Sequence, residues 1–471
     1  MIFHRDWTRR SFLKGSGLTL AGFGLTSLFP SSFLRHAMAA DATSDKRLLF
    51  IFLRGGIDGI NTLIPQGDPD YNTTNRPTLY IDPLDSIDLG NGFAHFHPGL
   101  SDLMDLHNAG QLASVHRVGY PGQSRSHFDS QRIYENGDPT QTTLFEGWLY
   151  RYVRENGVSS GVRLPVLTSQ STTPLIVRGA EKYVNVANPD SFDYLDQPPK
   201  RDKYEQAWER VYADVSRIGR HRGSLSALGL ELIGTLDEYR SWDQVNWNPT
   251  HPNTGNYLFP VDEATNPNDP SGPGGKMFPS SAYSYFRALK VCALSLLEAK
   301  ADGTTGTRVA GTQLGNFDHH DGQGGLAGDH RDLLKQLGYG LDSLYVALSG
   351  QATNEPRMYP SVWSDTVVIT LSEFGRTTKE NGSQGTDHAE GTTVFAAGGY
   401  VNGGVYNCDS SSWPAGVMFD IYNRYLSHAT DYRAVMWEIL RDHMGASQAT
   451  VDTIFPGYTA LNPPELGLIG V

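Results

Sequence analysis

The chain has 471 residues, of which 39% are hydrophobic and 19% charged, so it can bury a large core and is not a disordered protein. Its two cysteines exclude a disulfide framework and a zinc finger or ribbon. The formal net charge of −13 argues against a nucleic-acid binder held by phosphate contacts, and against adsorption to an anionic membrane surface.

The N-terminus predicts an export signal. Arg9 and Arg10 precede an uncharged, Gly/Leu-rich stretch, and Ala37 and Ala39 have the small side chains that a signal peptidase requires. The paired arginines indicate the twin-arginine type, and the apolar stretch is shorter than the roughly 20 residues that span a bilayer. We therefore expect residues 1–39 to be a twin-arginine signal peptide, recognised by the twin-arginine export machinery. The mature protein would be periplasmic or otherwise exported, with no membrane span after cleavage.

The mature chain alternates apolar runs with helical patterns. Continuous apolar runs at 47–53 and 366–371 are typical of strands buried on both faces of a parallel sheet. Shorter runs predict further strands at 113–118, 164–167, 307–317 and 393–397. Apolar positions three and four apart predict helices over 201–242, 282–300 and 330–348.

This order of elements predicts a three-layer α/β fold, with a mostly parallel central sheet and helices on both faces. Residues 246–275 are rich in Pro, Asn and Gly and lack periodicity, which predicts a surface excursion or linker. We expect a single domain over residues 40–471, with the helical segment 201–242 and the excursion 246–275 as insertions. Cys292 is expected to pack in a helix and Cys408 in a loop, and the pattern leaves open whether they pair.

Carboxylate and imidazole side chains gather near the expected strand ends. In open α/β sheets, functional groups collect beyond the carboxyl ends of the strands. The set suits one or two divalent cations, with Zn²⁺, Mn²⁺, Ca²⁺ and Mg²⁺ as candidates. Two cations would clamp both oxygens of an in-line displacement at phosphorus or sulfur. The predicted metal ligands are Asp58, Asp318, His320, Glu373, Asp387 and His388.

Each of these residues also has a simpler interpretation. Asp58, between glycines, would fix a turn. Asp318 and His320 would face the same side of a strand, but an exposed polar loop has the same composition. Glu373 directly follows an apolar strand, and Arg376 offers it an ion pair that needs no metal.

The glycine-rich loop before residues 393–397 contains Asp387 and His388, of which His388 is the favoured ligand. His95 and His97 also alternate, but their Phe-His-Phe-His-Pro context is more typical of packing residues.

A nucleophile is harder to identify from the sequence. Ser126 with Asp129 three residues later is a helix-capping pattern, and the same position suits a nucleophilic hydroxyl because helix N–H groups favour a developing anion. Thr62 is a weaker alternative. Arg125 would neutralise a phosphate or sulfate, or lie in solvent. The mature chain has no G-x-S-x-G elbow, no P-loop and no strand-linked G-x-G-x-x-G, so neither a serine-hydrolase elbow nor a nucleotide site is indicated.

Five motifs follow one another along the chain: Leu53-Arg54-Gly55-Gly56-Ile57-Asp58-Gly59, Arg125-Ser126-His127-Phe128-Asp129, Phe317-Asp318-His319-His320, Ser372-Glu373-Phe374-Gly375-Arg376 and Gly385-Thr386-Asp387-His388. Together with the leader, they resemble the bacterial domain-of-unknown-function 1501 family, from about Lys46 to the C-terminus. That family is similar in fold to the alkaline phosphatase and sulfatase superfamily.

The resemblance implies metals at the carboxyl edge of an alkaline-phosphatase-like sheet, held by residues of these motifs, with Ser126 or an activated water as nucleophile. The sequence differs from the superfamily pattern in three places. Arg54 directly follows the first strand, the Asp318-x-His320 spacing is closer than in many phosphatases, and Glu373 replaces an Asp-His pair.

The leading hypothesis is an exported, metal-dependent hydrolase of small phosphate or sulfate esters. The alternative is a non-catalytic exported protein that keeps the fold to bind a protein partner or to assemble at the cell surface.

Overall fold

The computed structural model describes residues 46–158, 164–179, 183–187, 244–301, 307–355 and 358–470, and a few positions between 206 and 242. The expected signal peptide and most of the expected helical segment 201–242 lie outside these residues. The described helices are α3 Gly59–Thr62, α4 Met104–Asn108, α5 His127–Asn136, α6 Trp148–Glu155, α9 Tyr283–Ala301, α10 Asp329–Leu348, α11 Tyr432–Glu438, α12 Val451–Ile454 and α13 Tyr458–Leu461. The strands are β1 Arg47–Leu53, β2 Leu63–Pro65, β3 Ile87–Asp88, β4 Ala94–Phe96, β5 Leu112–Gly119, β6 Val166–Thr168, β7 Val184–Asn185, β8 Val309–Leu314, β9 Thr366–Leu371, β10 Thr392–Gly398, β11 Gly404–Tyr406 and β12 Thr430–Asp431.

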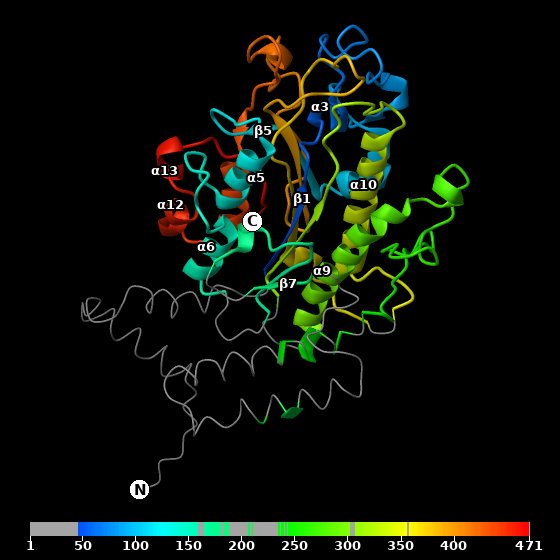
Figure 1. The fold of residues 1–471 in the computed structure, drawn as a ribbon, viewed down its shortest axis with the longest axis vertical. Helices are drawn as coiled ribbons and strands as arrows, with labels where there is room; N and C mark the ends of the chain where they lie inside the picture. The colour runs from blue at the N-terminus through cyan, green and yellow to red at the C-terminus, as the bar shows by residue number, and fades with distance from the viewer. Residues whose placement is uncertain are drawn as a thin grey trace, which may run out of the picture.

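A large, mostly parallel sheet forms the centre of the protein, as the sequence predicts (Figure 1). Its strand order is β11-β5-β10-β9-β1-β8-β6-β7, and β12 pairs with β5. The central strand β1 runs parallel to both neighbours, with Leu48 opposite Val309 on β8 and Phe50 opposite Ile369 on β9. Among the described strands of this sheet, only β10 runs antiparallel to its neighbours, β5 and β9. A smaller antiparallel sheet contains β2, β4 and β3.

Helices cover both faces of the sheet because β1 is apolar on both sides. Leu49, Ile51 and Leu53 belong to the core beneath α9 and α10, whereas Leu48 and Phe50 belong to the core beneath α5, α6 and α11. This alternation is what a period-two strand between two helical layers requires. The α/β architecture with helices on both faces is therefore the one predicted.

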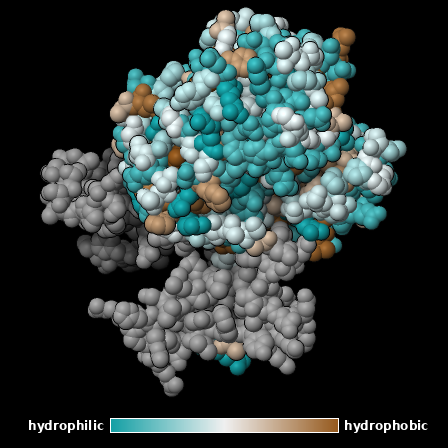
Figure 2. Space-filling view, turned by 45° about the horizontal axis from the view of Figure 1, so that its top comes forward, coloured by the Kyte–Doolittle hydropathy of each residue, from teal (hydrophilic) through white to brown (hydrophobic). Residues whose placement is uncertain are grey.

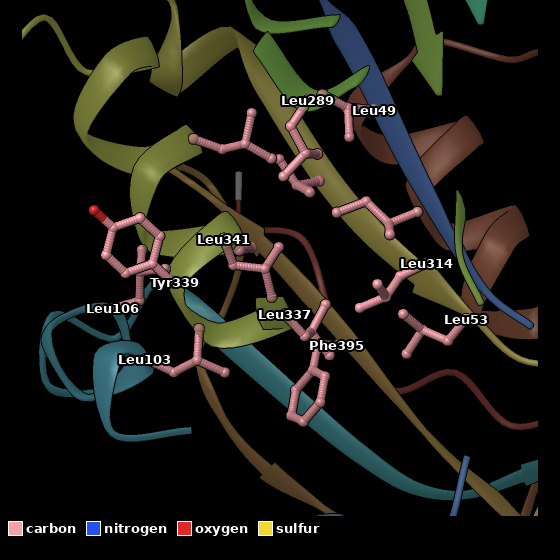
Figure 3. Packing of buried hydrophobic residues seen from close by; sticks show 14 of the residues in the cluster. Leu49, Leu53, Leu103, Leu106, Leu289, Leu314, Leu337, Tyr339, Leu341 and Phe395 are labelled. Carbon is pink, nitrogen blue, oxygen red and sulfur yellow. The ribbon is translucent and has the colours of Figure 1, made fainter. Parts of the chain in front are cut away.

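Helix α10 shows how the core on one face is built. Leu337 and Leu341 project from the helix towards the sheet, where Leu53 and Leu314 lie (Figure 3). Burying each leucine stabilises the fold by about 1.5–3 kcal/mol relative to leaving it exposed. The predicted helices over 282–300 and 330–348 correspond to α9 and α10, and the predicted strands at 47–53 and 366–371 have the bounds of β1 and β9.

The Pro/Asn/Gly-rich segment 246–275 is tied to α10 rather than extending freely from the surface. Its Trp247 and Phe259 are buried in the core. The Tyr339 hydroxyl of α10 donates a 2.6 Å hydrogen bond to the backbone oxygen of Tyr257. A tract without periodicity can thus still be held in place by isolated aromatic anchors.

Both cysteines, Cys292 and Cys408, are buried and unpaired. Among the described residues, no helix has the length and apolar composition needed to span a membrane.

Candidate metal centre

Loops from distant parts of the chain meet at the carboxyl edge of the sheet. Asp318 lies in the loop after β8, Glu373 follows β9, His388 precedes β10 and His127 begins α5. The parallel strands β8 and β9 end at one edge, so the loops that follow them are brought together there, and the antiparallel strand β10 begins at the same edge. Figure 2 turns the top of Figure 1 towards the viewer, and hydrophilic residues cover most of the centre of that face.

Three of these residues form a possible metal-binding group. One ligand atom each from His127, Asp318 and His388 lie within 4.8 Å of one another, and no other such group of His, Cys, Asp and Glu occurs in the described part of the chain. Nε2 of His127 is 3.3 Å from Oδ2 of Asp318, and Nε2 of His388 is 3.2 Å from Oδ1. Ligand atoms about 2.1 Å from a tetrahedral Zn²⁺ stand about 3.4 Å apart, and each of these two nitrogen–oxygen distances is close to that value.

Both imidazoles are oriented through their other nitrogen. Nδ1 of His127 is 2.9 Å from Oε1 of Glu373, and Nδ1 of His388 is 2.7 Å from the backbone oxygen of Arg125. Both oxygens only accept hydrogen bonds, so each Nδ1 is the donor. In a neutral imidazole, Nε2 is then the unprotonated nitrogen that a metal requires.

Glu373 is fully buried and is stabilised by several donors. Its Oε1 accepts hydrogen bonds from the Gly55 backbone N–H, from Nε2 of Gln131 and from His127, each within 2.9 Å. Burial alone raises the pKa of this carboxyl, but the hydrogen bonds from His127 and Gln131 hold it below its ordinary value. The hydrogen bond to Glu373 in turn raises the pKa of His127. Glu373 therefore contacts the possible metal-binding group by way of His127.

Arg376 pairs with Asp318 and not with Glu373. Its Nη2 is 2.6 Å from Oδ1 of Asp318. Burial raises the pKa of Asp318, but the hydrogen bond and charge of Arg376 bring it well below its ordinary range. The same buried guanidinium ties the loops together through the backbone carbonyls of Gly55, Gly56, Phe317 and Thr386. An ion pair within the segment Glu373 to Arg376, the metal-free interpretation of that motif, is thus wrong.

His320 and Asp387 extend the group towards solvent. Nε2 of His320 is 2.9 Å from Nε2 of His388 and 3.1 Å from Oδ1 of Asp318. Its Nδ1 is 3.2 Å from Oδ1 of Asp387, whose other oxygen accepts a 2.7 Å hydrogen bond from Arg424. Asp387 therefore contacts the imidazole of His320, while His320 itself reaches the possible metal-binding group.

The structure corrects the reason why Asp318 and His320 meet. Strand β8 ends at Leu314, and Asn316 has a left-handed backbone with φ of 73°. Asp318 and His320 therefore lie in a loop and not on a strand, so strand alternation does not explain their proximity. The expected strand 307–317 was too long at its carboxyl end.

Asp58 is held by a separate buried network. Its Oδ2 is 2.6 Å from Nη1 of Arg76 and accepts a 2.7 Å hydrogen bond from Gln323, while Oδ1 caps α3 by accepting from the Asn61 backbone N–H. Burial raises the pKa of Asp58, but the charge of Arg76 brings it well below its ordinary range. Both oxygens are occupied, and the structure does not bring Asp58 into the group of His127, Asp318 and His388.

The two residues predicted for catalysis lie beside the imidazoles. Ser126 is the N-cap of α5 and accepts from the Asp129 backbone N–H, so the capping interpretation is confirmed, while a nucleophilic role stays a prediction. The Arg125 guanidinium is 3.4 Å from Oε1 of Glu390 and 4.7 Å from the Tyr425 ring centroid.

Three residues with alternative interpretations are held by local hydrogen bonds. The Thr62 hydroxyl donates to the Asp58 backbone oxygen. His97 is buried and accepts from the Gly99 N–H, and His95 contacts the Ser86 hydroxyl, as packing residues would.

Sequence reasoning missed His127 as a possible ligand and Gln131 as a partner of Glu373. His127 directly follows Ser126, the helix N-cap that was considered as a nucleophile. His127 and Gln131 are four residues apart and lie on one face of α5, where both reach Glu373. This four-residue spacing was the only feature of the sequence that indicated that the two side chains face the same way.

A family model described as "Protein of unknown function (DUF1501)" matches residues 292–435. The match supports the DUF1501 family. It includes the loops after β8 and β9 and the loop before β10, whereas β1 and α5 lie outside the matched residues. No curated protein and no solved structure matches the chain.

Proposed function

We propose that this protein is an exported, metal-dependent hydrolase of phosphate or sulfate esters, with a sheet arranged as in alkaline phosphatases. The observation that carries the proposal is the convergence of His127, Asp318 and His388. Each imidazole donates through Nδ1 to an oxygen and turns Nε2 towards one carboxylate. Such partners on the far nitrogen are usual for histidines that bind metals.

His127, Asp318 and His388 would hold the metal, with His320 as a fourth ligand. Imidazole nitrogens favour Zn²⁺ over Ca²⁺ and Mg²⁺, which prefer oxygen ligands throughout. When bound, the metal would supply a Lewis acid that polarises an oxygen of the ester. Asp58 is not part of this proposed set, because Arg76 and Gln323 occupy its carboxylate.

The residues around the proposed metal ligands suit an anionic ester. Arg125 lies at an exposed position, with its backbone oxygen on His388 and its guanidinium 3.4 Å from Glu390. An anionic group would compete with Glu390 for that guanidinium. Ser126 places a hydroxyl at the N-terminus of α5, where the helix dipole favours negative charge. Arg125 would orient the ester, and Ser126 is the proposed nucleophile.

The test combines metal content with turnover. The exported protein is analysed for metals, stripped with a chelator and reloaded with Zn²⁺ or Mn²⁺, then assayed on a panel of phosphate and sulfate monoesters and diesters. We expect stoichiometric metal and metal-dependent hydrolysis. His388→Ala should lose both, whereas His95→Ala, a histidine on β4 outside the centre, should keep both. Reloaded protein that leaves the whole panel untouched would contradict the hydrolase and favour the non-catalytic binding protein.

Export is tested separately, because residues 1–39 lie outside the described structure. We expect the full chain to be processed near Ala39 and to leave the cytoplasm. Replacing Arg9 and Arg10 together by lysine should leave the unprocessed precursor inside the cell. Mass spectrometry of the purified protein gives the N-terminus, and normal processing of the double variant would contradict the twin-arginine route.

A further inference from the structure

A second feature of the carboxyl edge is a cavity of about 520 Å³ at the ends of β6 and β8, bounded by the start of α9 and by α10. Its volume is in the range of small-molecule sites, about 300–1,000 Å³. Hydroxyl and amide side chains dominate its walls, among them Ser169, Gln170, Ser284, Gln313, Asn316 and Gln336.

The lining has almost no charge. In the part of the chain that the structure describes, Arg287 is the only charged side chain on the walls, and it interacts electrostatically with Asp262. Hydroxyl and amide groups both donate and accept hydrogen bonds, which is the capacity that a ligand rich in hydroxyls requires. A cationic ligand would meet no acidic side chain on these walls, and an anionic ligand would compete with Asp262 for Arg287.

The cavity is built on rigid elements beside the metal centre. Oε1 of Gln313, at the end of β8, accepts a 2.7 Å hydrogen bond from Nε of Arg54, which leaves the amide N–H groups of Gln313 to donate elsewhere. Nη1 of Arg54 also donates to Gln131, the residue that donates to Glu373. A short chain of hydrogen bonds therefore separates the cavity wall from the metal centre.

We propose that this cavity binds an uncharged, polyhydroxylated molecule of the size of a monosaccharide or disaccharide. The proposal rests on the size and the uncharged polar lining of the cavity, and it does not depend on a metal or on hydrolysis.

Gly315 provides a way to block the cavity. It lies on the wall, its φ is not in the left-handed region, and a Cβ added there has no heavy atom within 4 Å. Gly315→Leu should therefore fill the space without straining the backbone. Gly382→Leu is the matched control, since its Cβ also meets nothing within 4 Å and the residue is in an exposed loop.

The experiment is calorimetric titration of the exported protein, both metal-replete and chelated, with glucose, N-acetylglucosamine, maltose and sorbitol, and with glucose 6-phosphate as a charged comparator. We expect saturable binding of at least one neutral compound in both metal states. Affinity should fall at least tenfold in Gly315→Leu and stay unchanged in Gly382→Leu.

Three results would overturn the proposal: no saturable binding of any neutral compound, equal binding by Gly315→Leu, or binding of the phosphate alone. Because binding is measured with the metal removed, its failure is distinct from a failure of the proposed hydrolase.

Discussion

Nδ1 of His127 and Oε1 of Glu373 lie 2.9 Å apart, and this hydrogen bond sets the direction of Nε2 towards Asp318. A buried carboxylate that orients an imidazole in this way usually strengthens metal binding by the second nitrogen. The pair also links α5 to the loop after β9, two segments that are 246 residues apart in sequence.

Glu373→Gln is expected to weaken metal binding about 10- to 100-fold while the protein stays folded, because the amide accepts the hydrogen bond from His127 without the negative charge. Competition with a chromophoric chelator measures the affinity. Glu438→Gln is the control, since Glu438 is also buried but accepts from the backbone N–H groups of Leu466 and Leu468. Equal affinities for Glu373→Gln and the unmodified protein would show that Glu373 does not act on the metal site.

Asp58→Asn should leave metal affinity unchanged and lower the free energy of unfolding at pH 7 by about 3 kcal/mol, since Arg76 would lose its buried partner. The folded-state pKa of Asp58 lies below its unfolded value. The contribution of the Asp58 carboxylate to the free energy of unfolding is therefore present above pH 3.8 and is lost as the pH falls below that value. Urea unfolding between pH 7 and pH 3 should show the difference between the two proteins shrinking at the acid end. A loss of metal affinity would instead restore Asp58 as a ligand.

Arg376→Lys is expected to lower the free energy of unfolding by about 2–4 kcal/mol. The planar guanidinium of Arg376 donates to four backbone carbonyls and to Asp318, and one ammonium group cannot make all of these hydrogen bonds. Guanidinium unfolding of the metal-free protein gives the value. Arg331→Lys, at an exposed ion pair with Asp332, should change stability by less than about 0.5 kcal/mol. Similar losses in both variants would argue against Arg376 as the link between the loops.

Asp342→Asn should stabilise the protein at alkaline pH. Burial, and then the charges of Asp102 and Asp105, raise the pKa of Asp342 to about 7. Since the folded-state value exceeds the unfolded one, the contribution of this group to stability is full below pH 3.8 and is lost as the pH rises through 7. The variant should therefore exceed the unmodified protein by about 2 kcal/mol at pH 8 and match it near pH 4. Thermal unfolding of the two proteins between pH 4 and pH 8 measures their difference in stability. A difference that stays constant across this range would contradict the raised pKa of Asp342.

Much of the fold follows from the sequence because the buried strands have strong local signals. The run that became β1 is apolar at every position after Arg47, and the run that became β9 is apolar except for Thr366 and Thr370, which is typical of a strand between two helical layers. The edge at which Asp318 and Glu373 meet follows in the same way, since the parallel strands β8 and β9 end together, whereas His388 reaches it because the antiparallel strand β10 begins there.

The partners within the candidate site could not be derived from the sequence. Arg376 lies three residues from Glu373 along the chain, yet it pairs with Asp318, 58 residues away. Glu373 instead meets His127. Asp58 was assigned to the metal because nothing in the local sequence points to Arg76 as its partner. Which side chains pair with one another depends on the geometry of the loops, and isolated sequence motifs do not determine that geometry.

The reversed direction of β10 has a consequence for how the candidate metal centre is assembled. Since β10 runs against β9 and β5, the chain enters the sheet at this rim through β10 and leaves it there through β8 and β9. His388 thus arrives on an incoming connection of three residues, 389–391, while Asp318 sits on an outgoing one. Lengthening that short connection would displace a single imidazole and leave the other proposed ligands where they are.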